Sequence, residues 1–189
     1  MNHILAEDSP QSMFLDKEGN IWINYLNARL TRYSPKTGHI RNFNLEGTGG
    51  DNAFRNIFCY CEDADGSLWL GSEVGVVNFN PANSEVKDLY RSHGMIFPCD
   101  KTMSIILDSE GRLWTATQGG IFRYEKDRKA RRKYTSDPNE GHLGSNYVNC
   151  ILEDSEGNIW AGTSSGLNIY DKESDSFNTL TCLGNVLNE

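Results

Sequence analysis

The stretch Asp154-Ser-Glu-Gly157-Asn-Ile-Trp160 recurs in four variants along this chain, each ending on one of its only four tryptophans. The other three are Asp16-Lys-Glu-Gly19-Asn-Ile-Trp22, Asp63-Ala-Asp-Gly66-Ser-Leu-Trp69 and Asp108-Ser-Glu-Gly111-Arg-Leu-Trp114. Successive tryptophans stand 47, 45 and 46 residues apart. A period of this size indicates one supersecondary unit copied four times.

Each copy predicts a β-hairpin around the repeated phrase. A short apolar run such as Tyr147-Val-Asn-Cys-Ile-Leu152 precedes the Asp, which supplies a turn acceptor, and the Gly three residues later tolerates positive φ. A second Gly, six residues past the Trp, predicts a second turn and a third strand in three copies: Gly75, Gly120 and Gly166. The first copy has Ala28 there, and its next aromatic, Tyr33, comes one residue late, which predicts a longer or bulged turn.

A fourth strand closes each unit, at residues 40–43, 86–89, 132–134 and 177–180. Four antiparallel strands in one such period are typical of a β-propeller blade. We therefore expect an all-β chain that forms a partial β-propeller of four four-stranded antiparallel blades, over residues 1–189 as one segment. The expected blades span residues 10–46, 54–90, 102–135 and 147–181. No segment shows apolar residues at helical spacing over several turns, which argues against a helical-repeat solenoid.

The composition limits the partners of the chain. It is 38% apolar and 11% aromatic, and no stretch approaches the ~20 apolar residues of a membrane span, so this segment is not expected to contact a membrane. A net charge of −8 argues against a nucleic-acid surface. The basic stretch Lys126–Lys133 falls between the third and fourth strands of its repeat, where solvated charges cost little. No nucleic-acid partner is expected.

The five cysteines give no evidence for a metal site or a disulfide framework. Cys59 and Cys61 share one strand face, but Cys61 occupies the repeat position of Phe14, Ile106 and Leu152. Cysteine here acts as a small hydrophobic residue. We expect neither a metal nor a cofactor, and the redox compartment stays open.

Catalytic residues are not expected either. The histidines His3, His39, His93 and His142 stand in no nucleophile, metal or phosphate motif. The four repeated aspartates, with their glycines and tryptophans, have a structural explanation, because every hairpin needs an acceptor at the same place.

The fourth copy, from Leu143-Gly-Ser-Asn-Tyr-Val148 through Asp154 and Trp160 to Tyr170-Asp171, resembles the two-component regulator propeller repeat. The likeness covers nearly the whole chain and is weakest in the first copy. It implies the sensor part of a hybrid two-component system, which lies in the periplasm ahead of a membrane helix and a histidine kinase. It also implies oligosaccharides as ligands and signalling through a dimer.

This chain has no kinase motif, so the segment by itself is expected to be no enzyme and to contribute recognition or scaffolding. Its start, Met1–Asp8, lacks the basic and apolar regions of a signal peptide. A periplasmic location is therefore expected if the segment is part of a longer sensor.

Four blades in an open arc leave two apolar faces to cover. Further blades, a tight four-bladed ring or a second copy of the chain would each cover them. We expect further propeller blades, because the ends of the chain fall inside the repeat frame. The second copy stays as the hypothesis for the isolated chain.

The connections from each fourth strand to the next first strand are the expected ligand site. In propellers they crowd one face beside the central channel, and here they carry aromatic and planar polar side chains, as sugar sites do. The candidate ligand-binding residues are Asp51, Asn52, Arg55, His93, Phe97, Asp100, Asn146 and Tyr147.

Two other functions stay open. One is a stand-alone protein-interaction platform without a small ligand. The other is a propeller lyase or sugar hydrolase, which needs an acid and a base facing one cavity, and for which only the loops of His93 and His142 give a hint.

Overall fold

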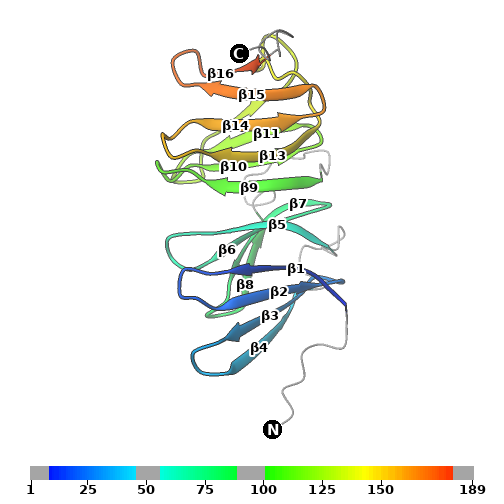
Figure 1. Ribbon diagram of the computed structural model, residues 1–189, viewed down its shortest axis with the longest axis vertical. Coiled ribbons are helices and arrows are strands. Elements are labelled where there is room, and N and C mark those ends of the chain that lie inside the picture. Colours follow the sequence, from blue (N-terminus) through cyan, green and yellow to red (C-terminus); the bar gives the residue numbers. More distant parts are fainter. Residues whose placement is uncertain (1–8, 46–55, 89–100, 181–189) are drawn as a thin grey trace, which may run out of the picture. The chain divides into compact units, whose positions relative to one another are not determined.

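The computed structural model describes residues 9–45, 56–88 and 101–180. These residues form sixteen strands in four antiparallel sheets of four strands each, and they contain no helix (Figure 1). In every sheet the strands lie side by side in chain order. This is the all-β blade architecture that the repeated phrase predicts.

Each repeat supplies one sheet. The first blade consists of β1 (Pro10–Leu15), β2 (Ile21–Tyr25), β3 (Arg29–Ser34) and β4 (His39–Asn44). The second blade consists of β5 (Ile57–Glu62), β6 (Leu68–Ser72), β7 (Gly75–Asn80) and β8 (Glu85–Asp88). The third blade consists of β9 (Thr102–Leu107), β10 (Leu113–Thr117), β11 (Gly120–Tyr124) and β12 (Arg131–Tyr134). The fourth blade consists of β13 (Val148–Glu153), β14 (Ile159–Thr163), β15 (Gly166–Asp171) and β16 (Ser176–Leu180).

The aspartate of each phrase bonds to the tryptophan six residues later. In chain order, the indole Nε1 of the Trp donates to a carboxylate oxygen at 2.9, 2.7, 2.7 and 2.8 Å. The phrase glycines have φ of 83°, 80°, 80° and 81°, a conformation that residues with a Cβ rarely adopt. The spacing of Asp, Gly and Trp thus encodes one hairpin and anchors the indole at its start.

The second turn differs in the first blade. Tyr25 pairs with Arg29 there, which leaves a three-residue loop, whereas Ser72 pairs with Gly75 in the second blade and leaves two residues. Asn27 and Ala28 have φ of 59° and 52°. The longer turn agrees with the sequence and explains why Tyr33 comes one residue late.

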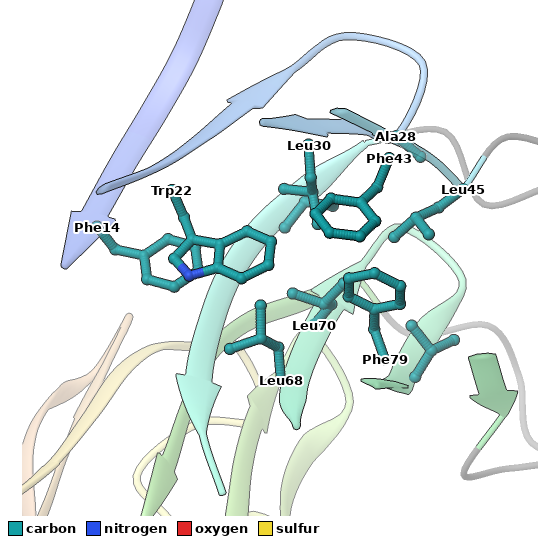
Figure 2. Close-up of a cluster of buried hydrophobic side chains, with 11 residues drawn as sticks. Phe14, Trp22, Ala28, Leu30, Phe43, Leu45, Leu68, Leu70 and Phe79 are labelled. Atoms are coloured by element: carbon teal, nitrogen blue, oxygen red, sulfur yellow. The ribbon is translucent and has the colours of Figure 1, made fainter. Parts of the chain in front are cut away.

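The contacts divide the chain into two units, with the boundary between Thr102 and Met103. In the first unit, Trp22, Leu30 and Phe43 of the first blade pack against Leu68, Leu70 and Phe79 of the second (Figure 2). The Trp22 ring lies 5.5 Å from the Phe43 ring, nearly parallel, and 6.4 Å from the Phe79 ring, edge on. Apolar side chains from the facing surfaces of two blades therefore form one core.

The second unit repeats this core between the third and fourth blades. Trp114 is fully buried and contacts the rings of Tyr134, Tyr170 and Phe177. In both units the tryptophan lies on the face that packs against the following blade. The following blade therefore contributes to stability by covering this face of the first and third blades.

Candidate functional site

Two of the eight predicted ligand-binding residues, Asn146 and Tyr147, are described by the structure. The other six, Asp51, Asn52, Arg55, His93, Phe97 and Asp100, lie outside the described residues. The connection between β12 and β13, residues 135–147, is therefore the expected ligand loop whose contacts the structure describes.

Backbone hydrogen bonds hold this loop closed. Thr135 N donates to Glu140 O at 2.7 Å, and Leu143 N donates back to Thr135 O at 2.9 Å. Phe177 N of β16 donates to Gly141 O at 2.8 Å, which ties the loop to the outer strand of the fourth blade. A side chain at Gly141 would meet the Tyr134 ring at 2.7 Å, so the loop approaches the core closely. Leu143 is buried within that core.

The polar side chains of the loop reinforce this geometry. Asn168, buried on β15, accepts hydrogen bonds from Gly144 N at 2.9 Å and from Thr179 Oγ1 at 2.8 Å. Asn146 is exposed, and its Oδ1 accepts from Ser136 N at 2.6 Å across the base of the loop. The Asn146 carboxamide therefore shapes the loop as well as facing solvent.

Tyr147 lies at the surface with 43% of its area exposed, next to a residue that the sequence did not single out. Gln118, in the turn between β10 and β11, donates from Nε2 to the Tyr147 hydroxyl at 2.6 Å. Ser145 Oγ accepts from Tyr147 N at 3.1 Å and from Ser164 Oγ at 2.8 Å. An aromatic ring, a carboxamide and two hydroxyl groups thus form one exposed patch, which we call the Tyr147 patch.

Strand direction explains why Gln118 and Ser164 belong to this patch. In a four-stranded antiparallel blade, the turn between the second and third strands emerges at the same end as the connection to the next blade. The first unit shows the same relation, since Asn56 N, just before β5, donates to Glu73 Oε2 in the turn between β6 and β7 at 3.0 Å. Including the turns between the second and third strands, as well as the connections between blades, would have identified Gln118 and Ser164 from the sequence.

The repeated carboxylates at the other end of the blades are structural. Asp16 Oδ1 accepts from Asn20 N at 2.8 Å, and Asp154 Oδ1 accepts from Asn158 N at 2.9 Å. Hydrogen bonds from Trp160 and Asn158 lower the pKa of Asp154. For Asp16 burial acts in the opposite direction, but hydrogen bonds from Asn20 and Trp22 together with the charge of Arg32 lower its pKa. Asp16 and Asp154 therefore stay ionised at neutral pH, and their carboxylate oxygens accept hydrogen bonds within their own hairpins.

The remaining candidates for chemistry have ordinary surroundings. Burial, with a smaller effect of the Cys61 thiol, raises the pKa of Cys59 to about 12, which keeps this thiol protonated. In the described parts of the chain no three His, Cys, Asp or Glu side chains gather in a way that could hold a metal ion. His142 is exposed, and His93 lies outside the described residues. The basic stretch Lys126–Lys133 spans the turn between β11 and β12 and the start of β12.

Solved structures similar to this chain include the extracellular domains of two proteins from B. thetaiotaomicron described as hybrid two component systems, BT4673 and BT3049. BT4673 has a TM-score of 0.70 and 24% identity, over 87% of this chain and 22% of that one. BT3049 has a TM-score of 0.72 and 19% identity, over 94% and 24%. Virginiamycin B lyase from Staphylococcus aureus has a TM-score of 0.65 and 15% identity, over 92% and 56%. Identities this low establish the β-propeller fold alone.

This chain thus spans less than a quarter of the two B. thetaiotaomicron chains that it resembles. No curated protein matches its sequence. The described residues hold no helix long and apolar enough to cross a membrane. Residues 53–73 and 142–165 match the family model of the two component regulator propeller. These two segments, which hold the second and fourth copies of the phrase, are therefore similar to the repeat of the two-component regulator propeller family.

Proposed function

We propose that this chain is part of the extracytoplasmic propeller of a hybrid two-component sensor, where it recognises oligosaccharides. The family repeats and the likeness to extracellular domains of such systems support the sensor. A periplasmic location follows from the same proposal. The segment acts in it by binding and not by catalysis.

The Tyr147 patch is the observation that carries the oligosaccharide part of the proposal. Sugar rings stack on aromatic faces, and their hydroxyl groups need planar polar partners held at set positions. Tyr147 offers an exposed ring. Gln118 Nε2 donates to the Tyr147 hydroxyl at 2.6 Å, and Ser145 Oγ accepts from the Tyr147 backbone N–H at 3.1 Å. Because the loop is tied to β16, little conformational entropy is lost when a ligand binds.

The test is oligosaccharide binding by the 189-residue chain and by single variants, measured by glycan array and then by calorimetry. Tyr147→Ala and Gln118→Ala should each weaken binding of the oligosaccharide that the array selects, by about tenfold. Phe58→Ala is the matched control, because Phe58 is an aromatic residue of similar exposure, 39%, on β5.

Binding that is unchanged in Tyr147→Ala and Gln118→Ala would remove the patch as the sugar site. A chain that binds no oligosaccharide on the array but captures a protein partner would favour the interaction platform instead. Equal losses in all three variants would indicate an indirect effect on folding.

The outer face of the fourth blade supports the proposal that further blades follow in the native protein. Leu152, Leu167 and Leu180 are exposed to 50%, 45% and 46%, and Trp160 is only half-buried. The register places these side chains at the positions of Phe14, Leu30, Phe43 and Trp22 in the first blade, which a neighbouring blade covers. An apolar face of this kind on a blade is the contact surface for another blade.

A further inference from the structure

The first and second blades correspond in detail to the third and fourth. The residue before the phrase Asp is Glu62 in the second blade and Glu153 in the fourth. Each carboxylate accepts a backbone N–H from the preceding blade at 2.8 Å, Lys17 N for Glu62 and Ser109 N for Glu153. The first and third blades have leucine at this position, Leu15 and Leu107. The two units can therefore be compared position by position.

In the second unit, two arginines lie between two carboxylates. Arg123 pairs in register with Trp114 on one side and with Arg132 on the other. Arg123 Nη1 donates to Asp175 Oδ1 at 2.6 Å, and Arg132 Nη1 lies 2.9 Å from Asp175 Oδ2. Arg123 Nε also donates to Glu125 Oε1 at 3.1 Å. Two positive charges are balanced by two negative charges.

The hydroxyl groups of Tyr134 and Tyr170 complete this cluster, donating to Asp175 Oδ1 at 2.7 and 2.5 Å. Asp175 is the last residue of the turn between β15 and β16, with φ of 49°. In the second unit, the two arginines at this place in the blade pair thus bind a carboxylate group.

In the first unit both arginines are kept and both carboxylates are replaced by serine. Arg32 pairs with Trp22 and with Arg41, as Arg123 does with Trp114 and Arg132. Ser34 stands two residues after Arg32, where Glu125 follows Arg123. Ser84 ends the turn between β7 and β8 with φ of 59°, at the position of Asp175.

Glu18 and Asp16 offset the charge of Arg32, whereas the charge of Arg41 has no paired acid among the described residues. Arg32 Nη2 donates to Glu18 Oε2 at 2.5 Å, but Glu18 is largely exposed. The Nε of Arg32 is buried, makes no hydrogen bond and lies 3.6 Å from Asp16 Oδ2. Arg41 reaches only Ser84 Oγ at 3.5 Å and the face of the Phe43 ring at 4.7 Å; among the described residues no acid pairs with it.

An open cavity of about 910 Å³ lies over these arginines. Its lining includes Arg32 and Arg41 together with Ser34, Lys36 and His39, and Glu18 is its one acidic residue. Ser34, His39, Arg32 and Arg41 share one strand face by register, so their side chains converge on the same side of the blade.

We propose that this cavity binds an anionic group, a carboxylate or a sulfate, which contacts Arg32 and Arg41 and takes the place that Glu125 occupies in the second unit. A planar guanidinium binds either group through paired hydrogen bonds, and Lys36 adds a further positive charge. The ligand displaces Glu18 from Arg32. This anion site lies at the blade end that carries the Asp-Gly turns, whereas the Tyr147 patch lies at the opposite end of its own blades. The anion site does not depend on the proposed sensor function.

The test titrates the 189-residue chain with sodium glucuronate, sodium sulfate and neutral glucose at constant ionic strength. Nitrogen-15 NMR of the arginine Nε–H groups reports binding residue by residue. We expect saturable binding of at least one anion, with shifts of the Arg32 and Arg41 signals, and none with glucose. The anion that binds more tightly identifies the group as carboxylate or sulfate.

Three variants make the assignment specific. Arg41→Gln should weaken anion binding about tenfold or more, because a charge-assisted bidentate contact is lost. Arg132→Gln, its counterpart that already pairs with Asp175, should leave the affinity unchanged. Ser84→Asp installs the carboxylate of the second unit and should abolish anion binding while raising the melting temperature.

Three results would overturn the proposal: no saturable binding of either anion, an equal loss in Arg41→Gln and Arg132→Gln, or undiminished binding in Ser84→Asp. Because Arg41 and Ser84 lie at the surface, circular dichroism of both variants should match the parent chain and exclude unfolding as the cause.

Discussion

At the scale of single residues, each repeated aspartate has two functions in one hairpin. Its backbone closes the turn, and in all four repeats a carboxylate oxygen accepts the indole N–H of the tryptophan. The other carboxylate oxygen of Asp16, Asp108 and Asp154 also accepts the backbone N–H four residues later. A buried indole N–H without a hydrogen-bond partner would cost about 1–3 kcal/mol of stability, and the hydrogen bond to the Asp avoids this cost. Asp and Trp are therefore one functional pair, separated by six residues.

The carboxylates make stability depend on acid pH. The pKa values of Asp16, Asp154 and Asp175 lie below their ordinary value of 3.8. For Asp175, burial by itself would raise the pKa, but the hydrogen bonds from Tyr134 and Tyr170 and the charge of Arg123 outweigh it. A carboxyl group whose pKa is lower in the folded state stabilises the fold above its unfolded pKa, and this contribution is lost as pH falls.

We therefore expect the free energy of unfolding to be flat from pH 7 to about pH 5 and to fall steeply below about pH 4. Asp154→Asn should lower stability at pH 7 and reduce the slope below pH 4, because one of the protonating groups is gone. Urea unfolding at a series of pH values measures both effects. Glu156→Gln, an exposed change in the same turn, is the control; an Asp154→Asn curve parallel to the parent curve would contradict the assignment.

At the scale of elements, the two kinds of turn need glycine for different reasons. Gly66, in the Asp-Gly turn of the second blade, has φ of 80°, and no atom lies within 4 Å of the place that a Cβ would take, so only backbone strain opposes alanine there. Gly120, at the start of β11, has φ of 120°, and a Cβ would lie 2.3 Å from the backbone oxygen of Tyr134. The second position therefore combines strain with a close approach of two strands.

Gly66→Ala should lower the free energy of unfolding by about 1–2 kcal/mol, the ordinary cost of a left-handed residue with a Cβ. Gly120→Ala should cost clearly more, because β12 has to move away from β11. Urea unfolding of the two variants gives the comparison directly. Equal losses would show that the contact with Tyr134 relaxes without cost.

At the scale of the whole molecule, every blade needs a neighbour for its tryptophan face. Trp114 is fully buried against the fourth blade, whereas Trp160 on the fourth blade is half-buried next to three exposed leucines. Further blades, as proposed, would convert the environment of Trp160 into that of Trp114.

Trp114→Ala should therefore cost about 3–5 kcal/mol of unfolding free energy in this chain, and Trp160→Ala clearly less. In a longer polypeptide that includes the next blade, the two losses should become similar. Denaturant unfolding of both variants in both chains tests this. A Trp160→Ala loss that does not change with chain length would show that no blade packs on this face.

The sequence by itself determined the blades, because Asp, Gly and Trp act within seven residues of one another, and hydrogen bonds and φ requirements at that range do not depend on the rest of the chain. It also predicted the longer turn at Ala28. Tertiary structure alone decided which side chains meet: Gln118 reaches Tyr147 across 29 residues, and Arg123 reaches Asp175 across 52. Such contacts depend on how two blades pack. The role of Ser34 and Ser84 in the proposed anion site is recognised only by comparison with Glu125 and Asp175, the carboxylates at the matching positions of the second unit.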